Sequence, residues 1–323
     1  MKKLTTSAPG KLMLFGEHAV VYNRPCIVTA VEQRMYATIE LLDLQNFELQ
    51  APDVKVTDYK KPVTDLGNGE IPKGAQFVEI AAKNFFEKYN ISHGIKITTK
   101  SDFSSEFGFG SSSASTVCVI KALSEIFDTK LSNKEIFDIS YKTVLEIQGK
   151  GSGFDVAAAV YGGTLYFVTG GKIIEQLQIL NIPLIVGYSG IKADTVSLIN
   201  SVKEFSNQNP QLVEGVYNSI EIIVNKAKEE VVKQNWEQVG LLMSENQKLL
   251  QSLGVSIPKI DNMILSANDA GAYGAKLSGA GGGDCIIAIA PPEKISDVKT
   301  SIEKCDAKIL HVSTNAKGVK IES

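Results

Sequence analysis

The sequence predicts an α+β protein of two domains. Strand patterns and helix patterns alternate along the 323 residues, with no internal repeat and no low-complexity linker. A chain of this length can bury a large core shared by two domains, and 44% hydrophobic with 21% charged residues is ordinary for a globular protein. We place the domain boundary near residues 172–182, which gives domains over residues 1–178 and 179–323.

Strands open the first half of the chain, and helices follow them. We expect strands near residues 11–15, 26–31 and 35–42, the last of which alternates in side-chain polarity. Apolar residues at helical spacing predict a helix over about residues 75–89. Ser132 and Glu135 have the spacing of a capping box, so a further helix is expected to begin there.

The second half begins with the predicted strand "IPLIVGYSG" at residues 182–190. Helical patterns then follow near residues 193–205, 211–233, 236–253 and 258–270. The chain closes with the strand-rich "AKLSGAGGGDCIIAIA", a helix and a last strand near Ile309.

Composition restricts the classes of partner. A net charge of −3, a pI near 5.8 and the lack of a long Lys/Arg block argue against a nucleic-acid partner. The apolar run near the N-terminus is short and broken by glycines, so we expect neither a signal peptide nor a membrane partner. The cysteines are far apart and lack zinc-site spacing, which predicts reduced thiols in a cytoplasmic protein; they are Cys26, Cys118, Cys285 and Cys305.

The segment "EFGFGSSSAST", residues 106–116, places glycines and serines directly before a helical pattern. The first N–H groups of a helix lack intrahelical partners and the helix dipole favours negative charge there, so such a loop can hold a phosphate. A serine hydroxyl can add an oxygen ligand for Mg²⁺. The alternative is a serine-rich N-cap after a flexible turn.

Two further segments are rich in glycine: "APGKLMLFGEHAVVYNRP" at residues 8–25 and "KLSGAGGGDCIIAI" at residues 276–289. None of the three glycine-rich segments matches the Walker P-loop or the G-x-G-x-x-G dinucleotide fingerprint. The sequence also lacks the G-x-S-x-G and H-E-x-x-H motifs, which argues against a serine hydrolase and a zinc metalloprotease.

Taken in chain order, the segments at residues 8–25, 106–116 and 276–289 resemble three motifs of the GHMP kinase superfamily, and the resemblance extends over the whole chain. Within this superfamily they are most similar to the mevalonate kinases. The resemblance implies an α+β fold of two domains, the first like domain 2 of a small-subunit ribosomal protein and the second ferredoxin-like. It also implies an ATP site between the domains and phosphoryl transfer to an alcohol. The oligomeric state stays open between a monomer and a homodimer.

The resemblance assigns the nucleotide and metal contacts. Ser112 corresponds to the family serine that binds Mg²⁺. The family's second metal ligand, a glutamate, falls at Val144 by its usual spacing, so either Glu146 turns in or Ser112, phosphates and water hold the metal. The residues assigned to the nucleotide are Gly108, Phe109, Gly110, Ser111, Ser112, Ser113, Gly279 and Gly281.

The resemblance also assigns the residues around the reacting hydroxyl. Asp155 in "GSGFD" corresponds to the catalytic aspartate, which can accept the substrate proton. Lys11 corresponds to the lysine beside it, whose charge would lower the pKa of the hydroxyl and stabilise the transferring phosphoryl group. Glu17 and His18 correspond to residues of the substrate pocket, where His18 could donate a hydrogen bond, and Thr195 is expected to face the same pocket.

The acceptor is expected to be mevalonate, phosphorylated at its C5 hydroxyl in isoprenoid biosynthesis. Residues 16–22 and 253–256 favour mevalonate, whereas "GSGFD" is more similar to phosphomevalonate kinases. A second substrate phosphate would need further cations, for which Arg24, Lys150, Lys192 and Lys203 are candidates. Galactokinase and homoserine kinase activities are weaker alternatives, and a non-catalytic ligand-binding protein of the same fold is an alternative of another class.

Overall fold

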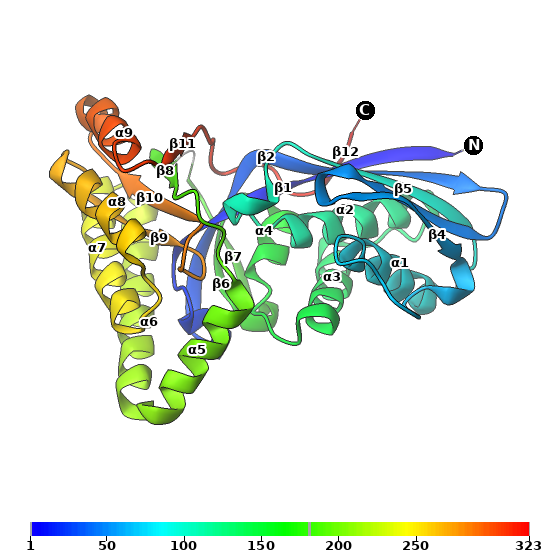
Figure 1. Ribbon diagram of the computed structural model, residues 1–323, viewed down its shortest axis with the longest axis horizontal. Helices are drawn as coiled ribbons and strands as arrows, with labels where there is room; N and C mark the ends of the chain where they lie inside the picture. Colours follow the sequence, from blue (N-terminus) through cyan, green and yellow to red (C-terminus); the bar gives the residue numbers. More distant parts are fainter. Residues whose placement is uncertain (1, 180–181, 323) are drawn as a thin grey trace.

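The computed structural model describes residues 2–179 and 182–322 and arranges them as two domains side by side (Figure 1). Residues 1, 180, 181 and 323 of the predicted domains lie outside the described residues. The chain passes from one sheet to the other between β7, Ile173–Leu177, and β8, Leu184–Tyr188. Near its C-terminus it returns, because β12, Lys320–Ile321, pairs with β1.

The N-terminal domain contains a sheet of eight described strands in the order β12-β1-β2-β5-β3-β4, with β6 paired to β2 and β7. All pairings are antiparallel except β3 with β5. The strands introduced here are β1 (Lys3–Phe15), β2 (Pro25–Leu42), β3 (Asn46–Ala51), β4 (Val56–Pro62), β5 (Gly94–Ser101) and β6 (Thr164–Val168).

Strand β2 corrects one prediction, because it runs unbroken where the sequence predicts two strands. Its first part pairs with β6 over Pro25–Thr29 and its second part with β5 over Met35–Leu42. The register with β1 shifts between Pro9 and Gly10, which is a bulge. The interruption in the sequence pattern therefore marks a change of neighbouring strand and a bulge, and not a loop.

Four helices cover one face of this sheet (Figure 1): α1 (Gln76–Tyr89), α2 (Ser111–Ile126), α3 (Asn133–Gln148) and α4 (Phe154–Tyr161). The capping box predicted at the start of α3 is confirmed. The Glu135 N–H donates to Ser132 Oγ at 3.3 Å, and the Ser132 N–H donates to Glu135 Oε2 at 2.9 Å.

The C-terminal domain has an antiparallel sheet in the order β11-β8-β10-β9, the strand order of a ferredoxin-like domain. The helical patterns of the sequence predict its long helices to within a few residues. Its remaining elements are α5 (Thr195–Gln208), α6 (Pro210–Val232), α7 (Trp236–Ser252), α8 (Pro258–Asp269), β9 (Gly274–Ser278), β10 (Cys285–Ile289), α9 (Ile295–Glu303) and β11 (Lys308–Leu310).

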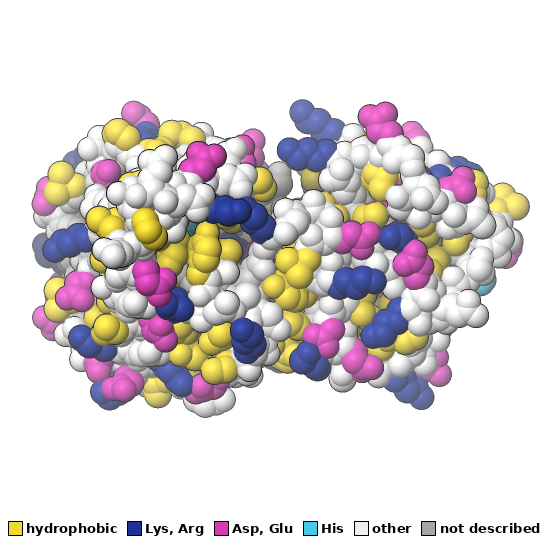
Figure 2. Space-filling model, turned by 90° about the horizontal axis from the view of Figure 1, so that it is seen from below, with side chains coloured by type: hydrophobic (Ala, Val, Ile, Leu, Met, Phe, Trp, Pro, Cys, Tyr) yellow, Lys and Arg dark blue, Asp and Glu magenta, His cyan; other side chains and the backbone are white. Residues whose placement is uncertain are grey.

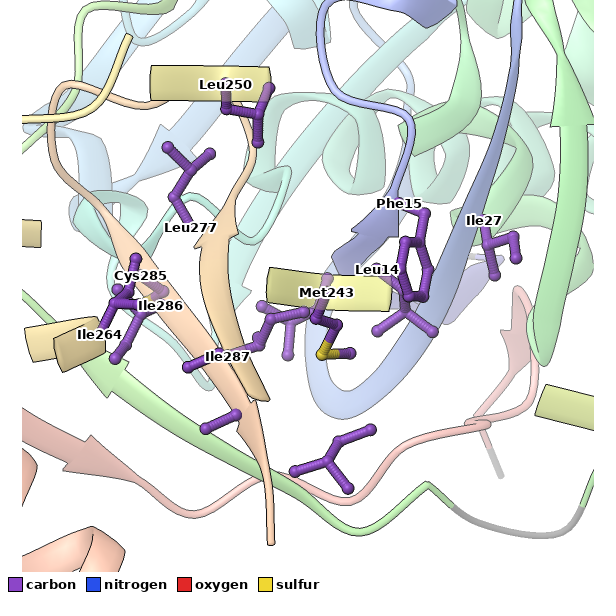
Figure 3. Packing of buried hydrophobic residues seen from close by; sticks show 14 of the residues in the cluster. Leu14, Phe15, Ile27, Met243, Leu250, Ile264, Leu277, Cys285, Ile286 and Ile287 are labelled. Atoms are coloured by element: carbon purple, nitrogen blue, oxygen red, sulfur yellow. The ribbon is translucent and has the colours of Figure 1, made fainter. Parts of the chain in front are cut away.

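One hydrophobic cluster spans both domains (Figure 3). Leu14 and Phe15 on β1 belong to the same buried cluster as Met243 on α7 and Leu277 on β9. Ser278 Oγ also donates to the Met13 carbonyl at 2.9 Å and accepts from the Met13 N–H at 3.0 Å. The end of β1 is therefore fixed against the C-terminal domain, and the loop that follows β1 lies at the junction.

Over residues 2–179 and 182–322, every helix is too short or too polar to span a bilayer. Lys and Arg side chains are interspersed with Asp and Glu side chains over the face in Figure 2. That face therefore carries no extended area of one charge sign.

Candidate active site

A cavity of about 220 Å³ lies where the two domains meet. The N-terminal domain supplies β1 and the starts of α2 and α4, and the C-terminal domain supplies the loops before α5 and after β9. Predicted site residues from all three glycine-rich segments line it. From these segments they are Lys11, Glu17, His18, Gly108, Gly110, Ser111, Ser112 and Gly279, and the predicted site residues Asp155 and Thr195, which lie outside the segments, line the cavity as well.

Two helix N-termini converge on this cavity. The N-cap of α2 is Gly110 with φ 76°, the N-cap of α4 is Gly153 with φ 91°, and no side chain caps either helix. A Cβ at Gly110 would lie 3.3 Å from the Lys11 side chain and 3.5 Å from the Asp155 Cβ, so glycine keeps the loop close to both residues. The first N–H groups of both helices are available to an anion, and both dipoles favour one.

Lys11 and Asp155 flank the start of α2. Lys11 is buried on β1, where its Nζ donates to the Gly108 carbonyl at 2.8 Å and lies 5.2 Å from the centroid of the Phe154 ring. Asp155 lies in the first turn of α4 and lines the same cavity. A positive charge and a carboxylate therefore face the space in front of Gly110.

Three predicted nucleotide contacts do not line the cavity. Phe109 is 2% exposed and packs against Phe103 and Phe107, and Ser113 is buried in the first turn of α2. Gly281 has φ 84°, and a Cβ there would lie 2.2 Å from the Val255 carbonyl oxygen. These residues hold the two loops in place from behind the cavity wall.

Glu146 is not brought to the cavity, in contrast to the sequence expectation. Its carboxylate accepts hydrogen bonds from Lys83 and Asn84 on α1, each at 3.0 Å. Burial raises the pKa of Glu146, but these hydrogen bonds and the Lys83 charge outweigh it and leave the pKa lowered. Val144 lines the cavity instead, because two residues turn a helix by about 200°. The structure thus separates Glu146 from Ser112, the other predicted metal ligand.

Glu17 forms an ion pair that the sequence did not predict. Its partner, Lys276, lies on β9, and both side chains are 0% exposed. Lys276 Nζ donates to Glu17 Oε1 and, at 2.5 Å, to the Leu277 carbonyl. Burial raises the pKa of Glu17 and lowers the pKa of Lys276, and the attraction between the two charges opposes both shifts. Glu17 Oε2 accepts no hydrogen bond of ordinary geometry from the described residues.

His18 occupies a strained position beside this pair. Its φ of 59° and ψ of −50°, with the Ala19 N–H donating to the Glu17 carbonyl at 2.6 Å, form a γ-turn that is rare in proteins. His18 Nε2 lies 2.8 Å from the Ala280 carbonyl oxygen, which assigns the proton to Nε2 because a carbonyl only accepts. Burial lowers the pKa of His18, so the neutral ring offers Nδ1 as an acceptor, and not the donor that the sequence predicts.

Several residues that line the cavity were not assigned a role from the sequence. Asp284 follows the third glycine run directly, and a carboxylate after five small residues was the signal available for it. From the sequence, Lys192 is a candidate only as a cation for a substrate phosphate. The other unassigned lining residues include Gln148, Ser152, Phe154 and Ala280. Within the described part of the chain, no three His, Cys, Asp or Glu side chains form a metal-binding cluster.

Comparison with known proteins agrees with this architecture. The family model "GHMP kinases N terminal domain" matches residues 76–163, and "GHMP kinases C terminal" matches residues 227–307. Among solved structures, a Listeria innocua protein, Lin0012, gives a TM-score of 0.87 at 26% identity and covers 100% of both chains. The Methanococcus jannaschii mevalonate kinase gives a TM-score of 0.82 at 27% identity and covers 98% of this chain and 99% of that chain.

A mevalonate kinase from Pyrococcus abyssi is 33% identical over 327 residues, which cover 98% of this chain and 97% of the relative. The similarity therefore extends through both domains and through all three glycine-rich segments. On this basis the chain belongs to the GHMP kinases and, among them, to the mevalonate kinase family.

Proposed function

We infer that the protein transfers the γ-phosphoryl group of ATP to the C5 hydroxyl of mevalonate and releases ADP. The observation that carries this inference is the cavity itself, where two uncapped helix N-termini, the Lys11 ammonium and the Asp155 carboxylate face one space. Phosphoryl transfer to an alcohol requires a phosphate cradle, a cation and a group that positions or deprotonates the hydroxyl.

A second cavity, of about 580 Å³, is suited to the nucleoside part of ATP. It shares Ser111, Ser112 and Gln148 with the first cavity, so the two cavities meet at the N-terminus of α2. Its walls carry apolar side chains that would contact a purine, among them Met35, Val54, Phe77, Val78 and Val196. The triphosphate would then run along the loop of residues 108–113 towards Asp155.

We expect Ser112 to hold Mg²⁺, because it corresponds to the family's metal-binding serine and lines both cavities where they meet, as Ser111 also does. When bound, the ion would neutralise charge on the phosphate oxygens. Because Glu146 is paired with α1, we expect the remaining metal ligands to be phosphate oxygens and water.

In the proposed reaction, the C5 oxygen forms a bond to the γ-phosphorus while the bond between that phosphorus and the β,γ-bridging oxygen breaks. Asp155 accepts the hydroxyl proton, and ADP leaves with the bridging oxygen. Lys11 stabilises negative charge on the transferring group. Glu17 and His18 both line the cavity, and the neutral His18 ring offers Nδ1 as an acceptor that suits a hydroxyl group of mevalonate. The Glu17 carboxylate is fully buried behind the wall, so we expect it to act on this part of the site through its neighbours.

Phosphomevalonate is a second candidate acceptor, because Lys150, which directly precedes the "GSGFD" turn, and Lys192 both line the cavity. The other two cations proposed from the sequence do not contribute. Arg24 is paired with Glu214 and Glu221 on α6, and Lys203 is exposed on α5.

A coupled ADP-release assay with mevalonate, 5-phosphomevalonate, galactose and homoserine tests the acceptor. We expect mevalonate to give the highest kcat/KM. A higher value with 5-phosphomevalonate would replace mevalonate as the substrate, and ATP binding without turnover of any acceptor would favour a non-catalytic protein.

The roles of Asp155 and Lys11 are tested by substitution. Asp155→Asn keeps the shape of the side chain but removes the base, so kcat should fall by about 10² to 10⁴ with little change in ATP affinity. Lys11→Met should also lower kcat. If the two residues act on the same hydroxyl, the double variant will be less impaired than the product of the single effects. Near-normal turnover by Asp155→Asn would remove Asp155 from the mechanism.

A further inference from the structure

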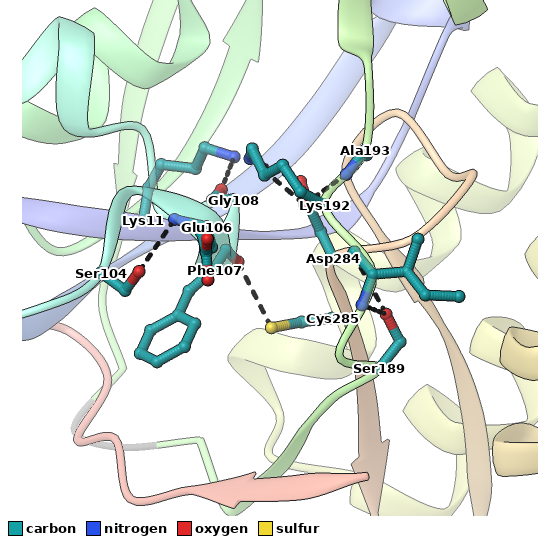
Figure 4. Close-up of polar contacts among 11 residues, drawn as sticks. Lys11, Ser104, Glu106, Phe107, Gly108, Ser189, Lys192, Ala193, Asp284 and Cys285 are labelled. Carbon is teal, nitrogen blue, oxygen red and sulfur yellow. Dashed lines mark hydrogen bonds and ion pairs between the residues drawn. The ribbon is translucent and has the colours of Figure 1, made fainter. Parts of the chain in front are cut away.

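A second lysine–carboxylate pair borders the cavity from the C-terminal domain (Figure 4). Asp284 is 6% exposed and has φ 54°, which is uncommon for a residue other than glycine. Its Oδ1 accepts the Ala193 N–H at 2.9 Å, and Lys192 Nζ lies 3.2 Å from Oδ1 and 3.5 Å from Oδ2. The Lys192 side chain is 47% exposed, so its ammonium is open to the cavity and to solvent.

The loop that carries Lys192 is fixed by its backbone. The Asp284 N–H donates to the Ile191 carbonyl at 2.8 Å, and the Ser189 N–H donates to the Asp284 carbonyl at 2.9 Å. Ser189 Oγ accepts the Ile191 N–H at 3.2 Å. Because these bonds hold the residues on both sides of Lys192, the side chain extends from a defined position.

This pair lies close to Lys11. Lys11 donates to the carbonyl of Gly108, and a Cβ on the same glycine would lie 2.5 Å from Asp284 Oδ2. In Figure 4 the side chains of Lys11 and Lys192 both extend towards Gly108 and Asp284. Both lysines also lie close enough to affect the pKa of the adjacent Cys285 thiol. Burial and the Asp284 charge raise this pKa, and the charges of Lys11 and Lys192 oppose that increase.

Two ammonium groups from different domains thus approach one place, with the Asp284 carboxylate beside them. The Lys192 side chain is nearly half exposed, so solvent screens its attraction to Asp284 and a phosphate oxygen can share the ammonium at small cost. The place lies at the glycine loop that would carry the phosphates and beside the lysine expected to contact the transferring group.

We propose that Lys192 is a second cation for the γ-phosphate of ATP, which contacts it from the C-terminal domain while Lys11 contacts it from the N-terminal domain. Asp284 is the positioning residue that keeps the Lys192 ammonium at the cavity. This proposal rests on the proposed function only in requiring that the cavity bind ATP, and it does not depend on which alcohol is the acceptor.

The test compares two nucleotides that differ in the γ-phosphate. Dissociation constants of AMPPNP and ADP are measured by calorimetric titration at one fixed Mg²⁺ concentration, without acceptor, for the parent protein, Lys192→Met and Lys192→Arg. Lys203→Met is the matched control, because Lys203 is an exposed lysine on α5 that does not line the cavity.

We expect Lys192→Met to weaken AMPPNP binding by about 10- to 100-fold, the value of one charge-assisted hydrogen bond, and to change ADP binding by less than about twofold. Lys192→Arg should keep most of the AMPPNP affinity, and Lys203→Met should change neither constant. An equal loss for both nucleotides, no loss for either, or an effect limited to the KM of the acceptor would each overturn the proposal. If the parent protein binds both nucleotides but does not phosphorylate mevalonate, the proposed acceptor is wrong. The comparison of AMPPNP and ADP binding would still test the role of Lys192.

Discussion

Two lysine–carboxylate pairs border the same cavity, and they differ in how much solvent reaches them. Glu17–Lys276 joins the loop after β1 to β9, with both side chains 0% exposed. Lys192–Asp284 joins two loops of the C-terminal domain, with the lysine side chain 47% and the aspartate side chain 9% exposed. The groups are chemically alike, so burial is what separates a pair that holds the domains together from a pair that can give its cation to a ligand.

The physical reason is the cost of leaving one charge behind. Removing one partner of a fully buried pair strands an ion in a poorly polarisable interior. At Lys192–Asp284 the ammonium is already largely solvated, and the Asp284 carboxylate keeps the Ala193 N–H as a donor when the lysine is removed. The comparison therefore predicts large effects on stability at Glu17–Lys276 and small ones at Lys192–Asp284. Effects on phosphate binding should follow the opposite order.

The largest effect is expected for Lys276→Met. At pH 7 it should lower the free energy of unfolding by about 3–5 kcal/mol, because the Glu17 carboxylate loses its charge partner inside the protein. Urea unfolding followed by circular dichroism measures this change.

The loss of unfolding free energy in Lys276→Met should also depend on pH, and the direction of that dependence can be predicted. Burial raises the pKa of Glu17, and without Lys276 the main opposing effect is gone. A group whose pKa is higher in the folded state stabilises the fold below its unfolded pKa and loses that contribution as the pH rises. The deficit of Lys276→Met should therefore be smaller at pH 5 than at pH 8.

A double variant supplies the control for Lys276→Met. Glu17→Gln combined with Lys276→Met has no stranded charge, so it should recover a large part of the lost free energy of unfolding. If the double variant is no more stable than Lys276→Met alone, the stability effect arises from packing, and the contrast between the two pairs fails.

An intermediate effect is expected from His18, which lies on the buried side of the cavity. Burial lowers its pKa, so the unfolded chain binds a proton there more readily than the folded protein does. The stabilising contribution is present above the unfolded pKa, about 6.5, and is lost as the pH falls towards the lower folded pKa, by at most about 1.4 kcal/mol per pH unit.

Unfolding free energies at pH 7.5 and pH 5.5 measure this contribution. His18→Asn should show a smaller loss between the two pH values than the parent, and asparagine is chosen because it tolerates positive φ. The exposed His311→Asn serves as the control and should behave like the parent. Equal pH slopes for the parent and His18→Asn would mean that His18 does not titrate differently on folding.

The parts of the site that the sequence predicts are those encoded locally. Glycine before each of α2 and α4 marks a positive φ at the helix start, and Ser132 with Glu135 forms the capping box from residues three positions apart. The buried partner of Glu17 could not be predicted in this way, because Lys276 is 259 positions distant and reads locally as a polar residue in a strand.

The sequence also did not predict the side of a helix or loop from which some side chains project. Glu146 was within two residues of the expected metal position, but those two residues turn its carboxylate towards α1 and leave Val144 at the cavity. Phe109 shows the same limit in a loop: the backbone of its segment borders the cavity while its ring packs among Phe103 and Phe107. Which way a side chain points depends on packing partners that only the tertiary structure supplies.

The smallest effect on stability is expected for Lys192→Met, and this result separates the two pairs most clearly. The lysine is nearly half exposed, and after its loss Asp284 still accepts the Ala193 N–H and borders the open cavity. The free energy of unfolding should therefore change by no more than about 1 kcal/mol, as for other exposed ion pairs. The same variant should lose discrimination between AMPPNP and ADP, whereas Lys276→Met should lose stability first. A loss of several kcal/mol in Lys192→Met would show that both pairs are structural, and would remove exposure as the property that distinguishes them.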